Sequence, residues 1–156
     1  MRGYDIANVL KKDILSRRVF KGVFPRDVLQ HLPVNSRHPS AYIINTASHN
    51  EPGEHWVAVW LHGGRGEYFD SYGLPPIKEH IEKFMKKHCR YYQWNRRVLQ
   101  GILSNTCGHY CLYYILQKAR GHSMDRICAR FNTFSHYAND KRVEMLTKPF
   151  FLRARF

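Results

Sequence analysis

One cysteine in this sequence stands where a nucleophile would be placed, at the junction between a polar loop and an apolar helix pattern. The residues before it, Ser104–Thr106, are all good N-cap residues, so Cys107 should lie in the first turn of a helix. There the unpaired N–H groups and the positive end of the helix dipole favour a thiolate. Gly108 follows directly, and a residue without a side chain lets a substrate backbone approach closely.

A cysteine nucleophile also needs a base, a group that orients the base, and donors for the oxyanion. His55 lies where a loop enters the most apolar predicted strand, and Asp70 closes the next strand after a glycine-rich turn. Antiparallel neighbours begin and end at the same edge of a sheet, so Asp70 could hold one tautomer of His55. Gln100, seven residues before Cys107, could direct its amide N–H at an oxyanion. These four side chains predict cysteine hydrolase chemistry.

Each of these residues also has an ordinary structural interpretation. The chain contains ten histidines, and Asp70 before Ser-Tyr-Gly suits a turn. Free cysteines on apolar helices are usually small hydrophobic residues, as we expect of Cys111 and Cys128. A zinc site at Cys107, His109 and Cys111 is disfavoured, because no C-x2-C pair is present and His109 points away from the shared helical face. We therefore expect no metal.

Hydrophobic periodicity predicts the elements that must position these groups. A turn or short strand is expected at 20–25, and the other predicted strands are 41–46, 55–61, 67–70 and 90–98. The predicted helices are 5–15, 27–32, the segment from Ile77 to Met85, 107–119, 123–131 and 140–146, with Pro149 ending the last one. The pattern predicts one α+β domain over residues 1–156, with helices flanking a small, mostly antiparallel sheet.

Length and composition agree with a globular chain of one domain. The 156 residues are 44% apolar and 14% aromatic, which argues against disorder. No apolar run approaches the ~18 residues of a membrane span, and no signal-peptide pattern opens the chain. The four cysteines lack the spacing of a disulfide framework, so we expect an intracellular, reducing environment and no membrane.

The charge balance predicts a polyanionic partner. The formal net charge is +13 and the isoelectric point is near 9.9, with lysines and arginines dispersed along the chain. Dispersed charge suits sequence-independent attraction to a polyanion such as a nucleic acid, because phosphate contacts need no fixed register. A well-solvated basic surface without such a partner is the alternative interpretation.

Four short blocks, in this order along the chain, resemble the adenovirus protease family (adenain). The segment His55–Trp60 resembles the histidine strand of that family, and Tyr68–Gly73 resembles its acidic-residue segment. Gln100-Gly101, followed by Cys107-Gly108 and Cys111, resembles its glutamine and nucleophile block. The same architecture is shared with SUMO- and Nedd8-type deconjugating proteases. The resemblance therefore implies a papain-like or adenain-like cysteine protease fold with the nucleophile at a helix N-terminus.

The resemblance also implies a role for each matched residue. Cys107 would be the nucleophile, and His55 would act first as general base and then as general acid. Asp70 would orient His55, and Gln100 would complete the oxyanion hole. The adenoviral enzymes carry Glu where this chain carries Asp70, and Asp is the residue of the SUMO-protease branch.

Substrate and cofactor expectations follow from the same resemblance. Trp56 would help to wall a narrow channel that selects glycines next to the scissile bond, and Gly108 would let the substrate backbone approach. Adenoviral proteases cleave virion precursor proteins and are stimulated by DNA and by a short peptide. Cys89 resembles the cysteine that binds this peptide, although the chain is shorter than the adenoviral enzymes after the catalytic helix.

The expected function is a monomeric cysteine endopeptidase that cleaves virion precursors at short Gly-containing motifs and is stimulated by DNA. It would belong to an adenovirus-related DNA virus or a Polinton or adintovirus-type element. It would act in the virion and in the host nucleus or viral factory. Two alternatives stay open: a deconjugating protease for ubiquitin-like modifiers, and a basic DNA-binding protein with a vestigial site.

Overall fold

The computed structural model describes residues 1–35 and 37–156. The strands are β1 (Phe20–Pro25), β2 (Ser40–Asn45), β3 (Trp56–His62), β4 (Arg65–Phe69) and β5 (Tyr91–Trp94). The helices are α1 (Gly3–Lys12), α2 (Glu79–His88), α3 (Cys107–Ala119), α4 (Met124–Cys128) and α5 (His136–Ala154), with short 3-10 helices η1 (Ser16–Arg18) and η2 (Arg26–His31). The predicted α+β class is confirmed.

The five strands form one mixed sheet in the order β1-β2-β3-β4-β5. The inner strands β2, β3 and β4 pair antiparallel, whereas β1 pairs parallel with β2 and β5 pairs parallel with β4. The sheet is therefore antiparallel at its centre and parallel at both edges. Parallel pairing requires a crossover connection, and η2 and α2 lie in the two connections concerned.

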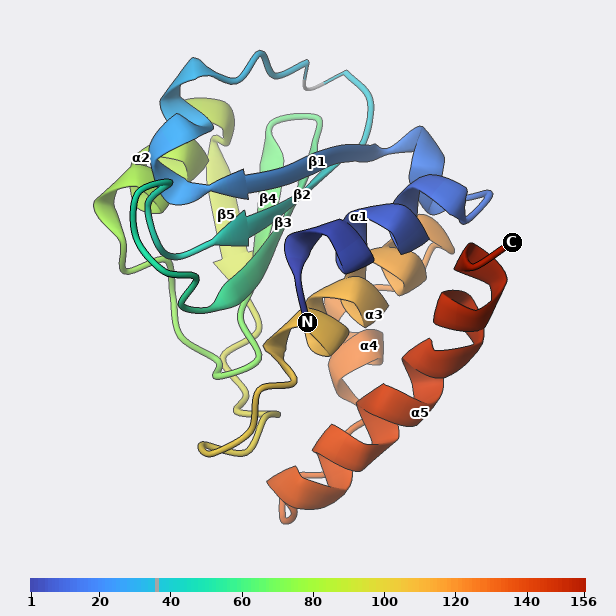
Figure 1. The fold of residues 1–156 in the computed structure, drawn as a ribbon. Coiled ribbons are helices and arrows are strands. Elements are labelled where there is room, and N and C mark those ends of the chain that lie inside the picture. Colours follow the sequence, from blue (N-terminus) through green and yellow to red (C-terminus); the bar gives the residue numbers. More distant parts are fainter. Residues whose placement is uncertain (36) are drawn as a thin grey trace.

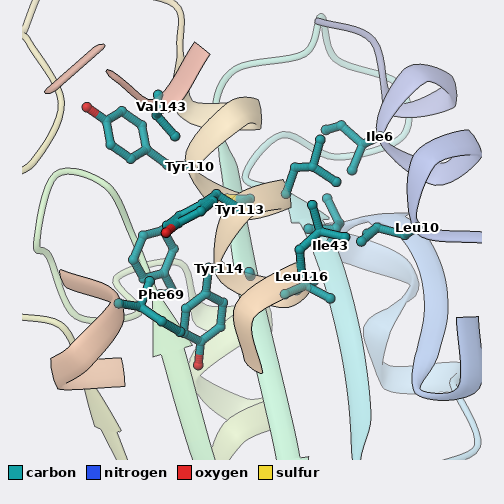
Figure 2. Close-up of a cluster of buried hydrophobic side chains, with 14 of the residues drawn as sticks. Ile6, Leu10, Ile43, Phe69, Tyr110, Tyr113, Tyr114, Leu116 and Val143 are labelled. Carbon is teal, nitrogen blue, oxygen red and sulfur yellow. The ribbon is translucent and has the colours of Figure 1, made fainter. Parts of the chain in front are cut away.

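Helices cover both faces of the sheet (Figure 1). On one face Ile43, Ala58 and Phe69 belong to an apolar cluster that also includes α1, α3 and α5 side chains. Figure 2 shows this cluster around α3, whose residues Tyr110–Leu116 are all buried. The other face packs on η2 and α2 through a second cluster. Strand β3 contributes to both clusters, as its continuous apolar run predicts.

The prediction that Pro149 ends the last helix is wrong, because α5 runs from His136 to Ala154 with this proline inside. Proline removes one N–H, which would otherwise donate to the carbonyl of Met145. Met145 is exposed, so water can satisfy that carbonyl. The side chain of Ser135 accepts a bond from the Ala138 N–H and starts the helix, a cap that periodicity alone does not reveal.

The segment before α2 also differs from prediction. Ile77 was expected on the helix, but α2 begins at Glu79 and the Ile77 side chain is 67% exposed. Strand β5 ends at Trp94, well before the predicted end at Val98, and Arg96 adopts φ 22° in the turn that follows. Both departures leave irregular chain close to the predicted site residues.

Candidate active site

His55 and Asp70 meet at one end of the β3–β4 hairpin. His55 immediately precedes β3 and Asp70 immediately follows β4, and the register pairs Ala58 with Phe69. His55 Nε2 lies 2.8 Å from Asp70 Oδ1, and the two side chains are only 16% and 5% exposed. Because Nε2 is engaged by the carboxylate, Nδ1 is the ring nitrogen that can face a nucleophile.

Two residues that were not identified from the sequence hold this pair. The backbone N–H of Tyr72 donates to Asp70 Oδ1 at 2.8 Å, and the Tyr72 ring stacks on His55 with centroids 5.0 Å apart. Asn95, just after β5, accepts from the Asp70 N–H at 2.9 Å and donates to the Asp70 carbonyl at 2.6 Å. The bond from the Tyr72 N–H to Asp70 is an Asx turn, which an Asp at the start of a turn sequence can indicate. Nothing local to Asn95 marks its contact.

Cys107 is the first residue of α3, as predicted. Thr106 stands at the N-cap position, but its hydroxyl donates to Asp140 instead of capping the helix. The first-turn N–H groups are therefore not occupied by a capping side chain. The neighbours that favour the charged form of the Cys107 sulfur are His55 and the backbone N–H groups of Trp56 and Gly108, which lower its pKa.

The pKa values of His55 and Cys107 move in the directions that favour an ion pair. Burial alone would lower the pKa of His55, but hydrogen bonds to Asp70 and Cys107 and their negative charges raise it to about 9. Burial alone would raise the pKa of Cys107, but the bond to His55, the backbone N–H donors and the His55 charge lower it. Both shifts favour transfer of the Cys107 proton to His55, which would give a thiolate beside an imidazolium.

Gln100 is held rigidly beside this pair. Its side chain is buried, and its amide oxygen accepts from the Ser71 hydroxyl at 2.5 Å. Its Nε2 donates to the Ser104 carbonyl at 2.9 Å, which leaves the second amide hydrogen for another acceptor. These two bonds fix the orientation of the Gln100 amide, with its NH2 group toward the loop that leads into Cys107.

All four predicted side chains line one cleft of about 450 Å³. The structure therefore brings together Cys107, His55, Asp70 and Gln100. The remaining walls include Tyr68, Tyr72, Glu54, Lys78 and the exposed apolar residues Leu74 and Ile77.

Trp56 and Gly108 do not line this cleft. The Trp56 Nε1 donates to the Met1 carbonyl at 3.2 Å. A Cβ added at Gly108 would lie 3.0 Å from the Met1 sulfur and 3.3 Å from the indole. The glycine therefore allows the Trp56 ring to pack against the start of α3.

Cys89 directly follows α2 and packs against Gly66 and against the second apolar cluster, on the sheet face covered by η2 and α2. Burial raises the pKa of its thiol to about 11, which disfavours the reactive thiolate. Within residues 1–35 and 37–156, no group of three or more His, Cys, Asp or Glu side chains is arranged to hold a metal ion. None of the helices described is long and apolar enough to cross a membrane.

The two pKa directions predict a bell-shaped pH profile for kcat/KM of peptide cleavage. Activity should rise through the lowered pKa of Cys107, below the ordinary thiol range, as the thiolate forms. It should fall as pH rises through about 9, where His55 loses the proton that the leaving amine needs. Initial rates measured between about pH 4 and about pH 10 test this. A rising limb near the free-thiol value of about 8.5 would contradict the ion pair.

No family model matches this chain. An Acanthamoeba polyphaga mimivirus protein named "Putative thiol protease R355" is 29% identical over 120 residues, covering 70% of this chain and 39% of that protein. The chain thus spans well under half the length of this curated relative.

Two solved structures are similar along nearly the whole chain. The ASFV pS273R protease has a TM-score of 0.55 at 16% identity, covering 99% of this chain and 66% of its own. ChlaDub1 from Chlamydia trachomatis has a TM-score of 0.53 at 14% identity, covering 97% and 76%. At these identities the likeness concerns the fold. It confirms the predicted adenain-like and SUMO-protease-like architecture.

Proposed function

We propose that this chain is a cysteine peptidase whose nucleophile is Cys107. The observation that carries the proposal is the convergence of a helix-start cysteine, a His–Asp pair and a buried glutamine amide in one cleft. The mimivirus relative, and the fold shared with the ASFV pS273R protease, support the same activity.

The geometry supports a two-step acyl transfer. The Cys107 thiolate attacks the scissile carbonyl, and the oxyanion binds the free Gln100 N–H and a backbone N–H at the start of α3. The His55 imidazolium protonates the leaving amine, and the neutral imidazole then removes a proton from the water that hydrolyses the thioester. Asp70 keeps Nε2 occupied, so Nδ1 carries the proton that moves.

The cleft favours an extended peptide with one apolar side chain. Leu74 and Ile77 lie along its wall and are 46% and 67% exposed. An apolar substrate residue lying there would bury surface that is otherwise wet. We propose peptides of the Leu-x-Gly-Gly kind in virion precursors as substrates, the glycines following from the adenain resemblance.

A deconjugating peptidase for ubiquitin-like modifiers is the second candidate, because ChlaDub1 shares the fold at similar coverage. A fluorogenic Leu-x-Gly-Gly peptide and a ubiquitin-like modifier carrying a C-terminal reporter separate the two. Cleavage of the peptide, lost in Cys107→Ala and stimulated by double-stranded DNA, is the expected result. Release only from the folded modifier would assign the second candidate, and no cleavage of either substrate would overturn the peptidase proposal.

DNA binding would use a surface that we call the basic end. It comprises the exposed side chains of Lys11, Lys12, Arg17, Arg18, Arg153 and Arg155. The ends of α1 and α5 meet there, since Lys12 Nζ donates to the Ala154 carbonyl at 2.5 Å (Figure 1). The carboxylate of nearby Asp13 is already paired with Arg120 at 2.6 Å. Positive charge therefore dominates this end of the molecule.

Charge reversal at the basic end should weaken DNA binding more than the same change elsewhere. Arg17→Glu/Arg18→Glu should lower affinity for a short duplex at least about tenfold and reduce the salt slope by about two. Lys86→Glu/Lys87→Glu, on α2 across the sheet, is the matched control and should cost markedly less. Equal losses in a salt titration of fluorescence anisotropy would show that binding is not concentrated at the basic end.

A further inference from the structure

A buried carboxylate on α5 collects hydrogen bonds from the segment that joins Gln100 to Cys107. Asp140 is 6% exposed, and within the part of the chain that the structure describes it makes no ion pair. It accepts from the Gly101 N–H at 3.1 Å, from the Thr106 hydroxyl at 3.0 Å and from the Tyr110 hydroxyl at 2.9 Å. All three donors belong to the loop or to α3.

Two of these contacts are made by the residues next to the two groups that would bind an oxyanion. Gly101 directly follows Gln100, and Thr106 directly precedes Cys107. A Cβ added at Gly101 would lie 2.8 Å from Asp140 Oδ2, so the close approach depends on this glycine. One carboxylate therefore ties together the two ends of the loop that separates the glutamine amide from the helix start.

Neighbouring contacts reinforce the same junction. Asn139 Nδ2 donates to the Leu99 carbonyl at 3.1 Å, and the Tyr110 hydroxyl lies 3.2 Å from the same oxygen. Burial, with the bond to Asp140 and its charge, raises the pKa of Tyr110 well above its ordinary value, so its hydroxyl stays a donor. Figure 2 shows Tyr110 of α3 beside Val143, which lies about one helical turn after Asp140 on α5.

We propose that Asp140 is a positioning residue for the oxyanion hole, and that α5 thereby sets the spacing between the Gln100 amide and the α3 N-terminus. The inference rests on the proposed peptidase function. A carboxylate suits the task because it offers only acceptors to three converging donors. An amide of the same shape would present an NH2 group to some of them and leave the loop imperfectly held.

The test separates oxyanion binding from thiolate formation. In Asp140→Asn we expect kcat for peptide cleavage to fall about 10- to 100-fold with KM little changed. Alkylation of Cys107 by iodoacetamide needs the thiolate but no oxyanion hole, so its rate should stay within about twofold. Asp125→Asn, an exposed carboxyl on α4, is the matched control and should change neither rate.

A double-mutant cycle tests whether Asp140 acts through Gln100. In a Gln100→Ala background, Asp140→Asn should lower kcat less than about threefold, because the amide that it positions is gone. Tyr110→Phe, which removes one donor, replaces Asp140→Asn if the latter does not fold, and should lower kcat with alkylation unchanged.

Equal losses of cleavage and alkylation, or effects of Asp140→Asn and Gln100→Ala on kcat that are fully additive, would show that Asp140 only stabilises the fold. An unchanged kcat in folded Asp140→Asn would also overturn the inference. If the unmodified chain cleaves no substrate, or Cys107→Ala still cleaves, the proposed function itself fails, which is a distinguishable outcome.

Discussion

Replacing Cys107 with alanine is expected to lower kcat/KM for the fluorogenic peptide by at least about 10,000-fold. The substitution removes the sulfur that would form the thioester, and no other cysteine can substitute for it. Cys111 is fully buried, and its pKa is raised well above the ordinary value by burial and by the neighbouring Cys107 and Asp70 charges. Affinity for a DNA duplex should be unchanged, because Cys107 lies in the cleft and not at the basic end.

Cys89→Ala is the matched control for this loss. Its thiol is half-buried and does not line the cleft, so peptide cleavage should stay within about twofold of the unmodified rate. The same variant examines the peptide cofactor expected from the resemblance, because a disulfide-linked activator would no longer attach. Residual cleavage by Cys107→Ala above about one part in a thousand would point to another nucleophile.

Replacing His55 with alanine is expected to lower kcat by about 1,000-fold or more and to raise the pKa of Cys107. The imidazole supplies both the proton for the leaving amine and the positive charge that favours the thiolate. Without it, burial dominates and the thiol stays protonated at neutral pH. Alkylation rates across pH, measured beside peptide cleavage, report the two effects separately.

His62→Ala is the natural comparison, because His62 ends the same strand at its opposite, exposed end. It should leave kcat and the alkylation profile unchanged. If His55→Ala alkylated at the unmodified rate near pH 7, the thiolate would owe little to the imidazolium, and the helix N-terminus would be its main support.

The arrangement of His55 and Asp70 could be predicted because hairpin geometry is local. Two apolar runs joined by Gly63–Gly66 specify antiparallel pairing, and antiparallel pairing brings the start of one strand to the end of the other. The position of Cys107 was predictable for a similar reason, since polar residues followed by a helical pattern mark a helix start.

The supports of the site were not predictable in this way. Asn95 reaches Asp70 across 25 positions, and Asp140 reaches Gly101 across 39. Such contacts depend on where β5 and α5 pack against the rest of the fold, and hydrophobic periodicity does not determine that. The parallel pairing of β1 with β2 and of β5 with β4 could not be predicted for the same reason, because hydrophobic patterns identify strands but not their directions.

In the β3–β4 hairpin the proposed catalytic residues and the connecting turn lie at opposite ends. His55 and Asp70 occupy one end, and the turn at Gly63–Gly64 occupies the other, with φ of 60° and 77°. Strands of this length place the turn about 20 Å from the base. Space around Gly63 is open, since a Cβ added there meets no atom within 4 Å. This turn is therefore a position where evolution, or a protein engineer, could splice in a guest module while the catalytic residues stay where they are.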